Sequence, residues 1–298
     1  MKFFEKEKIG KRRIIKILGI KFEYRAGKSY KLAEIKSSGV TETKREQKVI
    51  VSLTSFPARI KYISKTISSL LDQTLKPDMV ILWLGNEEFP NKEEDLPKEL
   101  LRLKEYGLTI KWCKDIKSFK KFIPAYKEFP NDLIVTVDDD IYYDRNMLEI
   151  LYKSYLKEPQ YIHCHRCTKI YYKNGKIKAK AGGKKYYNYP SFANKLCGMG
   201  GVIYPPNSLY KDITDENLFK TLCPTNDDIW FWLMAVLQGT KVKVVKHNIP
   251  QPAEIDETID GPCLTKINDH GQKLFYKDLE SVLNHYQGLE EKIKADMK

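Results

Sequence analysis

The sequence predicts an α/β domain with a mostly parallel sheet flanked by helices, preceded by a basic N-terminal extension. Short apolar segments, typical of buried strands, alternate with segments whose apolar residues recur at helical spacing. Four such strand–helix units follow one another from residue 49, and a less regular half begins near residue 145. Strands joined through helices run parallel and need helices on both faces of the sheet. We therefore expect one domain over residues 49–298, with residues 1–48 as an extension and linker.

The composition is that of a soluble globular protein. Of the 298 residues, 42% are hydrophobic and 31% are charged, and the longest apolar runs fall well short of the roughly 20 residues that a membrane-spanning helix needs. The net charge is +13, yet residues 1–48 hold fifteen Lys or Arg against six Asp or Glu, so the rest is only weakly basic. A nucleic-acid-binding protein would spread its basic residues over a folded face, so we expect no nucleic-acid partner.

The basic extension is the part of the chain expected to contact a membrane surface. A basic amphipathic helix is predicted over residues 11–20, a strand over 20–24 and a polar linker over 37–47. Each Lys or Arg near an anionic leaflet adds about 1 kcal/mol of attraction, so residues 1–36 would suit the inner face of a cell membrane. The alternative is a solvated extension. The start, MKFFEKEKIGKRR, lacks the apolar segment of a signal peptide, so we expect a cytoplasmic protein.

Each predicted element of the first half rests on a local pattern. Apolar, β-branched runs predict four strands, at 48–53, 79–85, 108–113 and 133–137. Helical spacing predicts helices at 60–73, 96–107 and 144–157, and residues 118–129 are expected to be helical or turn-like. Gly107 is a typical helix end, and Pro124 limits the segment 118–129.

The second half is less regular. A strand is predicted at 161–167, followed by a hairpin that turns at Asn174-Gly175. Residues 198–201, GMGG, precede another apolar run, and residues 225–239 form a helix with polar and acidic residues in its first turn. A strand at 241–247 and a closing helix at 275–294 complete the chain.

Polar residues gather where the four parallel strands end. Ligands bind outside the carboxyl ends of the strands in open α/β sheets, so these residues are expected to face one crevice. They are Thr54 to Arg59 after the first strand, Asn86 and Glu87 after the second, Lys114 and Asp115 after the third, and Asp138 to Asp140 after the fourth.

The three consecutive aspartates, Asp138 to Asp140, repel one another unless a cation or hydrogen-bond donors compensate. Side chains two apart on an extended chain point the same way, so Asp138 and Asp140 can share one cation while Asp139 points elsewhere. Hard oxygen ligands suit Mg²⁺ or Mn²⁺, which keep positions open for substrate phosphates. The pattern therefore predicts a metal that holds a diphosphate, with a plain turn or helix cap as the alternative. No GxGxxG follows the first strand, so dinucleotide redox chemistry is unsupported.

Five motifs in order, VSLTSFPARI, SFKKFIPAY, IVTVDDDIYY, GMGGVIYPP and TNDDIWFW, span residues 49 to about 250. With them the chain resembles bacterial GT-A fold glycosyltransferases of the kind that build surface polysaccharides. The resemblance implies a nucleotide-sugar donor, a UDP-sugar first of all, and a saccharide or lipid-linked acceptor. Residues 49–144 would then form the nucleotide-binding half and residues 145–298 the acceptor-binding half.

The resemblance also implies roles for individual residues on the donor side. Asp138 and Asp140 would bind the metal on the diphosphate, and Asp139 would contact the ribose or the donor sugar. Asp115 would accept a hydrogen bond from a uracil-like base. The other implied donor contacts are Thr54, Arg59 and Lys121 with Lys120 as its rival, and Gly200 and Gly201, where the backbone would approach the sugar.

On the acceptor side the resemblance implies an acidic pair at the start of a helix, Asp227 and Asp228. Asp228 would be the base that deprotonates the acceptor hydroxyl, and one of the two would cap the helix. A histidine after a late strand would be the third metal ligand; His247 is preferred and His270 is the alternative. Inversion of the sugar is favoured, and retention stays open.

Two other functions remain as alternatives. A phosphohydrolase could use Asp138 and Asp140 as nucleophile and acid, but such enzymes usually carry the motif on their first strand, whereas here it follows the fourth. A non-enzymatic basic membrane-associated module would carry its charge on the folded domain, which is only weakly basic.

Overall fold

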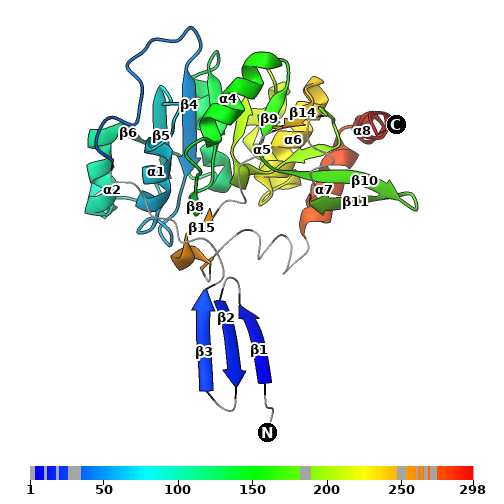
Figure 1. Ribbon diagram of the computed structural model, residues 1–298. Helices are drawn as coiled ribbons and strands as arrows, with labels where there is room; N and C mark the ends of the chain where they lie inside the picture. Colours follow the sequence, from blue (N-terminus) through cyan, green and yellow to red (C-terminus); the bar gives the residue numbers. More distant parts are fainter. Residues whose placement is uncertain are drawn as a thin grey trace.

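The computed structural model describes residues 4–9, 12–17, 20–25, 35–181, 189–246, 253–259, 261–262, 264, 268 and 274–297. Its centre is a seven-stranded sheet in the order β14-β9-β13-β7-β4-β5-β6 (Figure 1). The strands are β4 (Val49–Thr54), β5 (Met79–Gly85), β6 (Leu108–Cys113), β7 (Leu133–Thr136), β9 (Ile162–Cys164), β13 (Val202–Tyr204) and β14 (Val242–Val244). Within the described residues, no helix is both long and apolar enough to cross a membrane.

The sheet is mostly parallel, as predicted. Strands β4, β5, β6 and β7 pair in parallel, β14 is parallel to β9, and only β13 runs antiparallel to its neighbours β7 and β9. The chain first builds outward from β4 through β5 to β6 and then places β7 on the other side of β4. The order of the strands therefore reverses between β4 and β7, and such a switch point leaves a crevice at their carboxyl ends.

Helices cover both faces of the sheet because alternate strand residues point to opposite faces. Val49 and Val51 of β4 pack with α1 (Ile63–Leu71), α2 (Lys98–Arg102) and α4 (Met147–Lys157). Ile50 points to the opposite face and belongs to the cluster of α3, α5, α6, α7 and α8. These helices are α3 (Ile123–Glu128), α5 (Glu216–Leu222), α6 (Asp227–Gln238), α7 (Leu274–His285) and α8 (Leu289–Ala295).

Two predicted helices are divided in the structure. The segment 96–107 consists of α2 followed by a 3₁₀ turn (Leu103–Tyr106), and Gly107 ends it with φ of +107°. A Cβ at Gly107 would lie 2.7 Å from Val40, so glycine is required by both the dihedral and the packing. The closing helix is broken at Gly288, which has φ of +78° and separates α7 from α8.

A second, three-stranded sheet extends from the C-terminal half of the domain. It consists of β10 (Cys167–Lys173), β11 (Lys176–Ala181) and β12 (Asn194–Leu196) in the order β11-β10-β12. Asn174 and Gly175 connect β10 and β11 with φ of +52° and +71°, the left-handed pair that a tight hairpin turn favours. The predicted hairpin is thus confirmed. A short pair, β8 (Ile141–Tyr142) with β15 (Ala253–Glu254), closes over the end of β7.

The helix predicted over residues 11–20 is wrong. The chain forms an antiparallel meander of β1 (Phe4–Ile9), β2 (Arg12–Ile17) and β3 (Ile20–Arg25). The run RRIIKI is rich in β-branched isoleucine, which favours strands, and two flanking strands supply its backbone hydrogen bonds. The strand predicted at 20–24 is confirmed as β3.

The predicted polar linker is attached to the domain. The backbone N–H groups of Gly39 and Thr41 donate to Tyr106 O and Pro77 O at 2.8 and 2.9 Å. Arg45 forms an ion pair with Asp78 and donates to a backbone carbonyl of the same loop. This stretch therefore follows the surface of the domain up to β4.

Candidate active site

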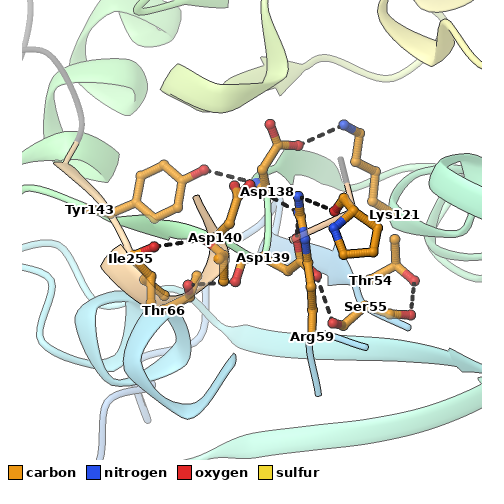
Figure 2. Close-up of polar contacts among 12 residues, drawn as sticks. Thr54, Ser55, Arg59, Thr66, Lys121, Asp138, Asp139, Asp140, Tyr143 and Ile255 are labelled. Atoms are coloured by element: carbon orange, nitrogen blue, oxygen red, sulfur yellow. Dashed lines mark hydrogen bonds and ion pairs between the residues drawn. The ribbon is translucent and has the colours of Figure 1, made fainter. Parts of the chain in front are cut away.

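The switch point between β4 and β7 brings together the residues that follow these strands. Thr54 ends β4 and Ser55 follows it, and Asp138 to Asp140 follow β7, which pairs with β4 in parallel (Figure 2). Thr54 Oγ1 donates to the backbone carbonyl of Trp83 on β5 at 2.8 Å, so its hydroxyl ties two strands together at this edge. The predicted meeting of strand ends is therefore present.

Asp139 lies in the wall of the site with both carboxylate oxygens engaged. Ser55 Oγ donates to one oxygen and Arg59 Nη1 to the other, both at 2.6 Å, and Thr66 Oγ1 donates to the Asp139 carbonyl at 2.9 Å. Burial raises the pKa of Asp139, and Arg59 opposes the rise. These contacts fix the turn after β7. Ser55 was not singled out from the sequence, although it sits in the loop that was.

Asp140 faces the same arginine from the other side. Its Oδ2 lies 2.9 Å from Arg59 Nη1, and its carbonyl accepts from the N–H of Ile255 at 2.8 Å (Figure 2). Burial raises the pKa of Asp140 to about 7; Arg59 opposes this, and the carboxylates of Asp139 and Asp138 add to it. The pKa of Arg59 is itself raised, since the pull of these acids outweighs its burial. One guanidinium thus balances two acids.

Asp138 turns toward a different cation, Lys121. Lys121 Nζ donates a hydrogen bond to Asp138 Oδ1 at 2.8 Å. Asp227 Oδ2 also lies 2.8 Å from this nitrogen and forms an ion pair with it, but without the geometry of a hydrogen bond. The Lys121 side chain is only 7% exposed. Burial would lower its pKa, yet Asp138 and Asp227 outweigh burial and raise that pKa well above its usual value. The buried ammonium therefore stays charged and joins the turn after β7 to the start of α6.

The predicted acidic pair opens α6 and its two members have different environments. Asp227 is 6% exposed, and burial raises its pKa while Lys121 opposes the rise. Asp228 is more accessible, with 25% of its side chain exposed. Both Asp228 oxygens accept from the N–H of Gly198 at 3.2 and 3.0 Å, and Lys195 Nζ lies 3.8 Å away.

The glycine cluster approaches the carboxylates at Gly198. A Cβ built on Gly198 would lie 3.0 Å from Asp228 Oδ1, 3.0 Å from Lys121 Nζ and 3.3 Å from Asp138 Oδ1. Gly200 and Gly201, the predicted donor contacts, have other neighbours: a Cβ at Gly200 would meet Arg166, and one at Gly201, where φ is +88°, would meet Met147. Gly198 is therefore the glycine of this cluster that approaches the carboxylates, and the contact of Gly200 and Gly201 with a donor stays a prediction.

Asp115 and Lys120 form a second charged group at the ends of β5 and β6. Lys120 Nζ donates to Asp115 Oδ1 at 2.6 Å and also to Glu88, and its side chain is 2% exposed. Lys117 contributes a backbone N–H to Asp115 at 2.9 Å and an ammonium contact. Burial would raise the pKa of Asp115, but the hydrogen bonds from Lys117 and Lys120 outweigh it and lower that pKa to about 2. Asp115 is thus an anion at any working pH.

The carboxylates of Asp138 and Asp140 have the chemistry that a divalent cation needs, but they supply only two ligands. Asp138 uses one oxygen in its ion pair with Lys121, and its side chain is 30% exposed. Asp140 uses one oxygen in its ion pair with Arg59, and its side chain is 25% exposed. Among the described residues, no three His, Cys, Asp or Glu side chains converge on a metal position. Mg²⁺ is commonly held by one or two carboxylates with substrate phosphates and water, which this pair fits. The expected third ligand, His247, and its alternative, His270, lie outside the described residues.

No protein-family model matches the chain, and no curated protein matches it. Solved structures are similar. S. aureus TarS 1-349 in complex with UDP-GlcNAc superposes with a TM-score of 0.50 and 13% identity over 83% of this chain and 69% of that one. S. aureus TarS 1-349 alone superposes with a TM-score of 0.45 and 16% identity over 68% of this chain and 59% of that one. GalNAc-T7 with UDP, GalNAc and Mn²⁺ superposes with a TM-score of 0.45 and 9% identity over 70% of this chain and 46% of that one. The chain thus spans less than two thirds of the length of these last two.

The chain has a GT-A fold. The similarity to TarS with UDP-GlcNAc, together with the mixed seven-stranded sheet and its switch point, confirms at the level of the fold the resemblance seen in the sequence motifs. In this GT-A fold Asp138, after β7, and Asp227, at the start of α6, both lie 2.8 Å from Lys121 Nζ.

Proposed function

We propose that this protein is a glycosyltransferase that moves a sugar from a nucleotide-diphosphate sugar, a UDP-sugar first of all, to the hydroxyl of a saccharide or lipid-linked acceptor. The observation that carries the proposal is the convergence of Asp138, Asp227 and Asp228 around Lys121 at the switch point. The GT-A fold, shared with a protein crystallised with UDP-GlcNAc, supports the choice of donor. A role in cell-surface polysaccharide synthesis, at the inner face of the membrane, is part of the same proposal.

Asp228 is proposed as the base that deprotonates the acceptor hydroxyl. It is the accessible member of the acidic pair, and a base must reach the hydroxyl within hydrogen-bond distance. The N–H of Gly198 donates to both of its oxygens and holds the carboxylate in place at the start of α6. Asp227, buried against Lys121, positions this turn rather than meeting the substrate. Attack by the activated hydroxyl in one displacement would invert the sugar.

Asp138 and Asp140 are proposed to hold a Mn²⁺ or Mg²⁺ ion together with the donor diphosphate. When bound, such an ion stabilises the negative charge of the leaving diphosphate. Arg59 and Lys121 balance the carboxylates themselves, so we assign them to building the site rather than to direct phosphate contact. Asp139, with both oxygens bound by Ser55 and Arg59, likewise supports the turn and is not assigned to the donor sugar.

Asp115 is proposed to receive the base of the donor. Its carboxylate is anionic and faces the end of β6, and one of its two ammonium partners, Lys117, is 71% exposed and can be displaced by an N–H of uracil. Lys120 is buried and stays in place, so it holds the carboxylate in position.

The experiment that tests the proposal is donor binding followed by donor turnover. UDP should raise the melting temperature in the presence of Mn²⁺ or Mg²⁺ but not in EDTA, and Asp138→Asn with Asp140→Asn should abolish the shift. Asp228→Asn should keep the UDP shift and lose sugar transfer, and NMR of the transferred sugar should show the inverted anomer. The proposal fails if no nucleotide diphosphate shifts the protein with any of these metals. Release of inorganic phosphate from phosphate esters, without UDP binding, would instead favour the phosphohydrolase.

A further inference from the structure

A row of lysines covers one face of the hairpin formed by β10 and β11. Side chains on a strand alternate between faces, and residues opposite each other in an antiparallel pair share a face. The register pairs Lys173 with Lys176, Tyr171 with Lys178 and Lys169 with Lys180. These six residues therefore lie on a single face of the hairpin, which we call the lysine face. Figure 1 shows the hairpin projecting from the body of the domain.

The opposite face of the hairpin anchors it to the domain. Ile170 is fully buried, and Ile177 and Ala179 pack against the same core cluster as α6, α7 and α8. The ring of Tyr172 lies under the ammonium of Lys294 on α8, 4.7 Å from its centroid. The apolar face thus holds the hairpin in place and leaves the lysine face turned away from these helices.

Four lysines of the lysine face carry a charge that the described residues do not neutralise. Lys169 donates to Asn194 Oδ1 at 3.0 Å. Within the ranges that the structure describes, no carboxylate pairs with the ammonium groups of Lys173, Lys176, Lys178 or Lys180. Like charges directly opposite one another, as in Lys173 and Lys176, destabilise a hairpin. An anionic ligand along this face would relieve that repulsion.

We propose that the lysine face binds an acceptor that is an anionic saccharide polymer, one carrying repeated phosphate or carboxylate groups. On β11 the lysines recur every second residue, about 7 Å apart, and on β10 Lys169 and Lys173 flank Tyr171, so that the charges form a band two strands wide. This narrow band suits a linear chain of charges rather than a broad membrane surface. Tyr171, 38% exposed amid the lysines, offers an aromatic face for a sugar ring.

The strand β12 connects the base of the hairpin to the candidate active site. β12 pairs with β10 at that base, with Lys169 opposite Asn194 and Thr168 opposite Lys195. Lys195, which shares a face with Thr168 and not with the lysine face, lies 3.8 Å from Asp228, and Gly198, just beyond β12, donates its N–H to the same acid. A polymer held on the lysine face would therefore lie beside the strand that leads to the proposed base. This assignment of the acceptor rests on the proposed glycosyltransferase function, whereas binding of the polymer does not.

The test is direct binding to two soluble probes, inorganic polyphosphate and polygalacturonate, which separate phosphate from carboxylate as the recognised group. A hairpin variant replaces Lys173, Lys176, Lys178 and Lys180 with Gln. A matched control makes the same charge change at four exposed lysines on other elements, Lys44, Lys98, Lys127 and Lys157. At about 0.1 M salt we expect the hairpin variant to bind at least one probe at least tenfold more weakly than wild type, with a shallower dependence of affinity on salt. The control variant should stay within about twofold, and the UDP-induced melting shift should be equal in all three proteins.

Several results would overturn the proposal. These are equal binding by wild type and the hairpin variant, an equal loss in the control variant, or no binding of either polymer. Hairpin-dependent binding of anionic phospholipid vesicles or single-stranded RNA, where both soluble polymers fail to bind, would also overturn it, since it would assign the face to a membrane or a nucleic acid. If the polymers bind through the hairpin but UDP never shifts the protein, the glycosyltransferase function fails while the polymer site stands.

Discussion

Replacing Lys121 by methionine should destabilise the protein strongly, because this change leaves Asp227 buried without its cation. The ammonium lies 2.8 Å from both Asp138 and Asp227, and Asp227 is 6% exposed. Breaking a buried ion pair by removing one partner costs about 3–5 kcal/mol. Asp138 is 30% exposed, so its share of the loss is below about 1 kcal/mol. We therefore expect the free energy of unfolding to fall by about 3–5 kcal/mol, mostly on account of Asp227.

The assay is urea unfolding at neutral pH of wild type, Lys121→Met, Asp227→Asn and the double variant. If the loss arises from the stranded Asp227 charge, the double variant should regain about 2 kcal/mol or more relative to Lys121→Met, a coupling that a double-mutant cycle measures. A matched control is Lys153→Met, which removes an exposed ion pair with Glu149 and should leave the free energy of unfolding almost unchanged. A double variant no more stable than Lys121→Met would refute the reasoning, because the cost would then lie in the lysine stem rather than in the charge.

Three further changes test other parts of the site and the core. Gly198→Ala should lower the rate of sugar transfer about tenfold or more with an unchanged UDP shift, because its methyl group would press on Asp228 Oδ1 at 3.0 Å; transfer at the wild-type rate would contradict this contact. Asp115→Asn should raise the KM for the donor about tenfold and leave kcat within a few-fold, as measured by UDP release; a fall in kcat alone would place Asp115 outside the base site. His163 is buried, and burial lowers its pKa to about 4. Between pH 4 and 6.5 the unfolded chain therefore binds more protons at this residue than the folded protein does. The free energy of unfolding should fall by about 3 kcal/mol as the pH is lowered through this range. His163→Gln should remove this acid-sensitive part of the unfolding curve, whereas the exposed His285→Gln should leave it unchanged.

The elements of the fold could be predicted where the signal is local. The four parallel strands and the Asn174-Gly175 hairpin follow from β-branched runs and turn residues, and these are properties of a few neighbouring side chains. The same local reasoning failed at residues 12–17, because a short run of isoleucine and basic residues is compatible with helix and with strand. Pairing with β1 and β3 decides between them, and that pairing is a tertiary contact.

The candidate site divides in the same way. That acids follow β7 and open α6 is legible in the chain, since carboxylates at strand ends and helix starts are local patterns. Which glycine meets them is not. Gly198, Gly200 and Gly201 differ by one to three positions, and only the path of the backbone beside Asp228 selects Gly198.

By itself the sequence determined an α/β sheet whose strand ends collect aspartates, because hydrophobic periodicity and the side-chain period of a strand are written residue by residue. The tertiary structure alone decided how the three aspartates separate. Asp139 and Asp140 share Arg59, whereas Asp138 shares Lys121 with Asp227, a residue 89 positions later in the chain. A buried cation goes to the carboxylates that the fold places within about 3 Å of it, and no spacing in the sequence encodes that distance.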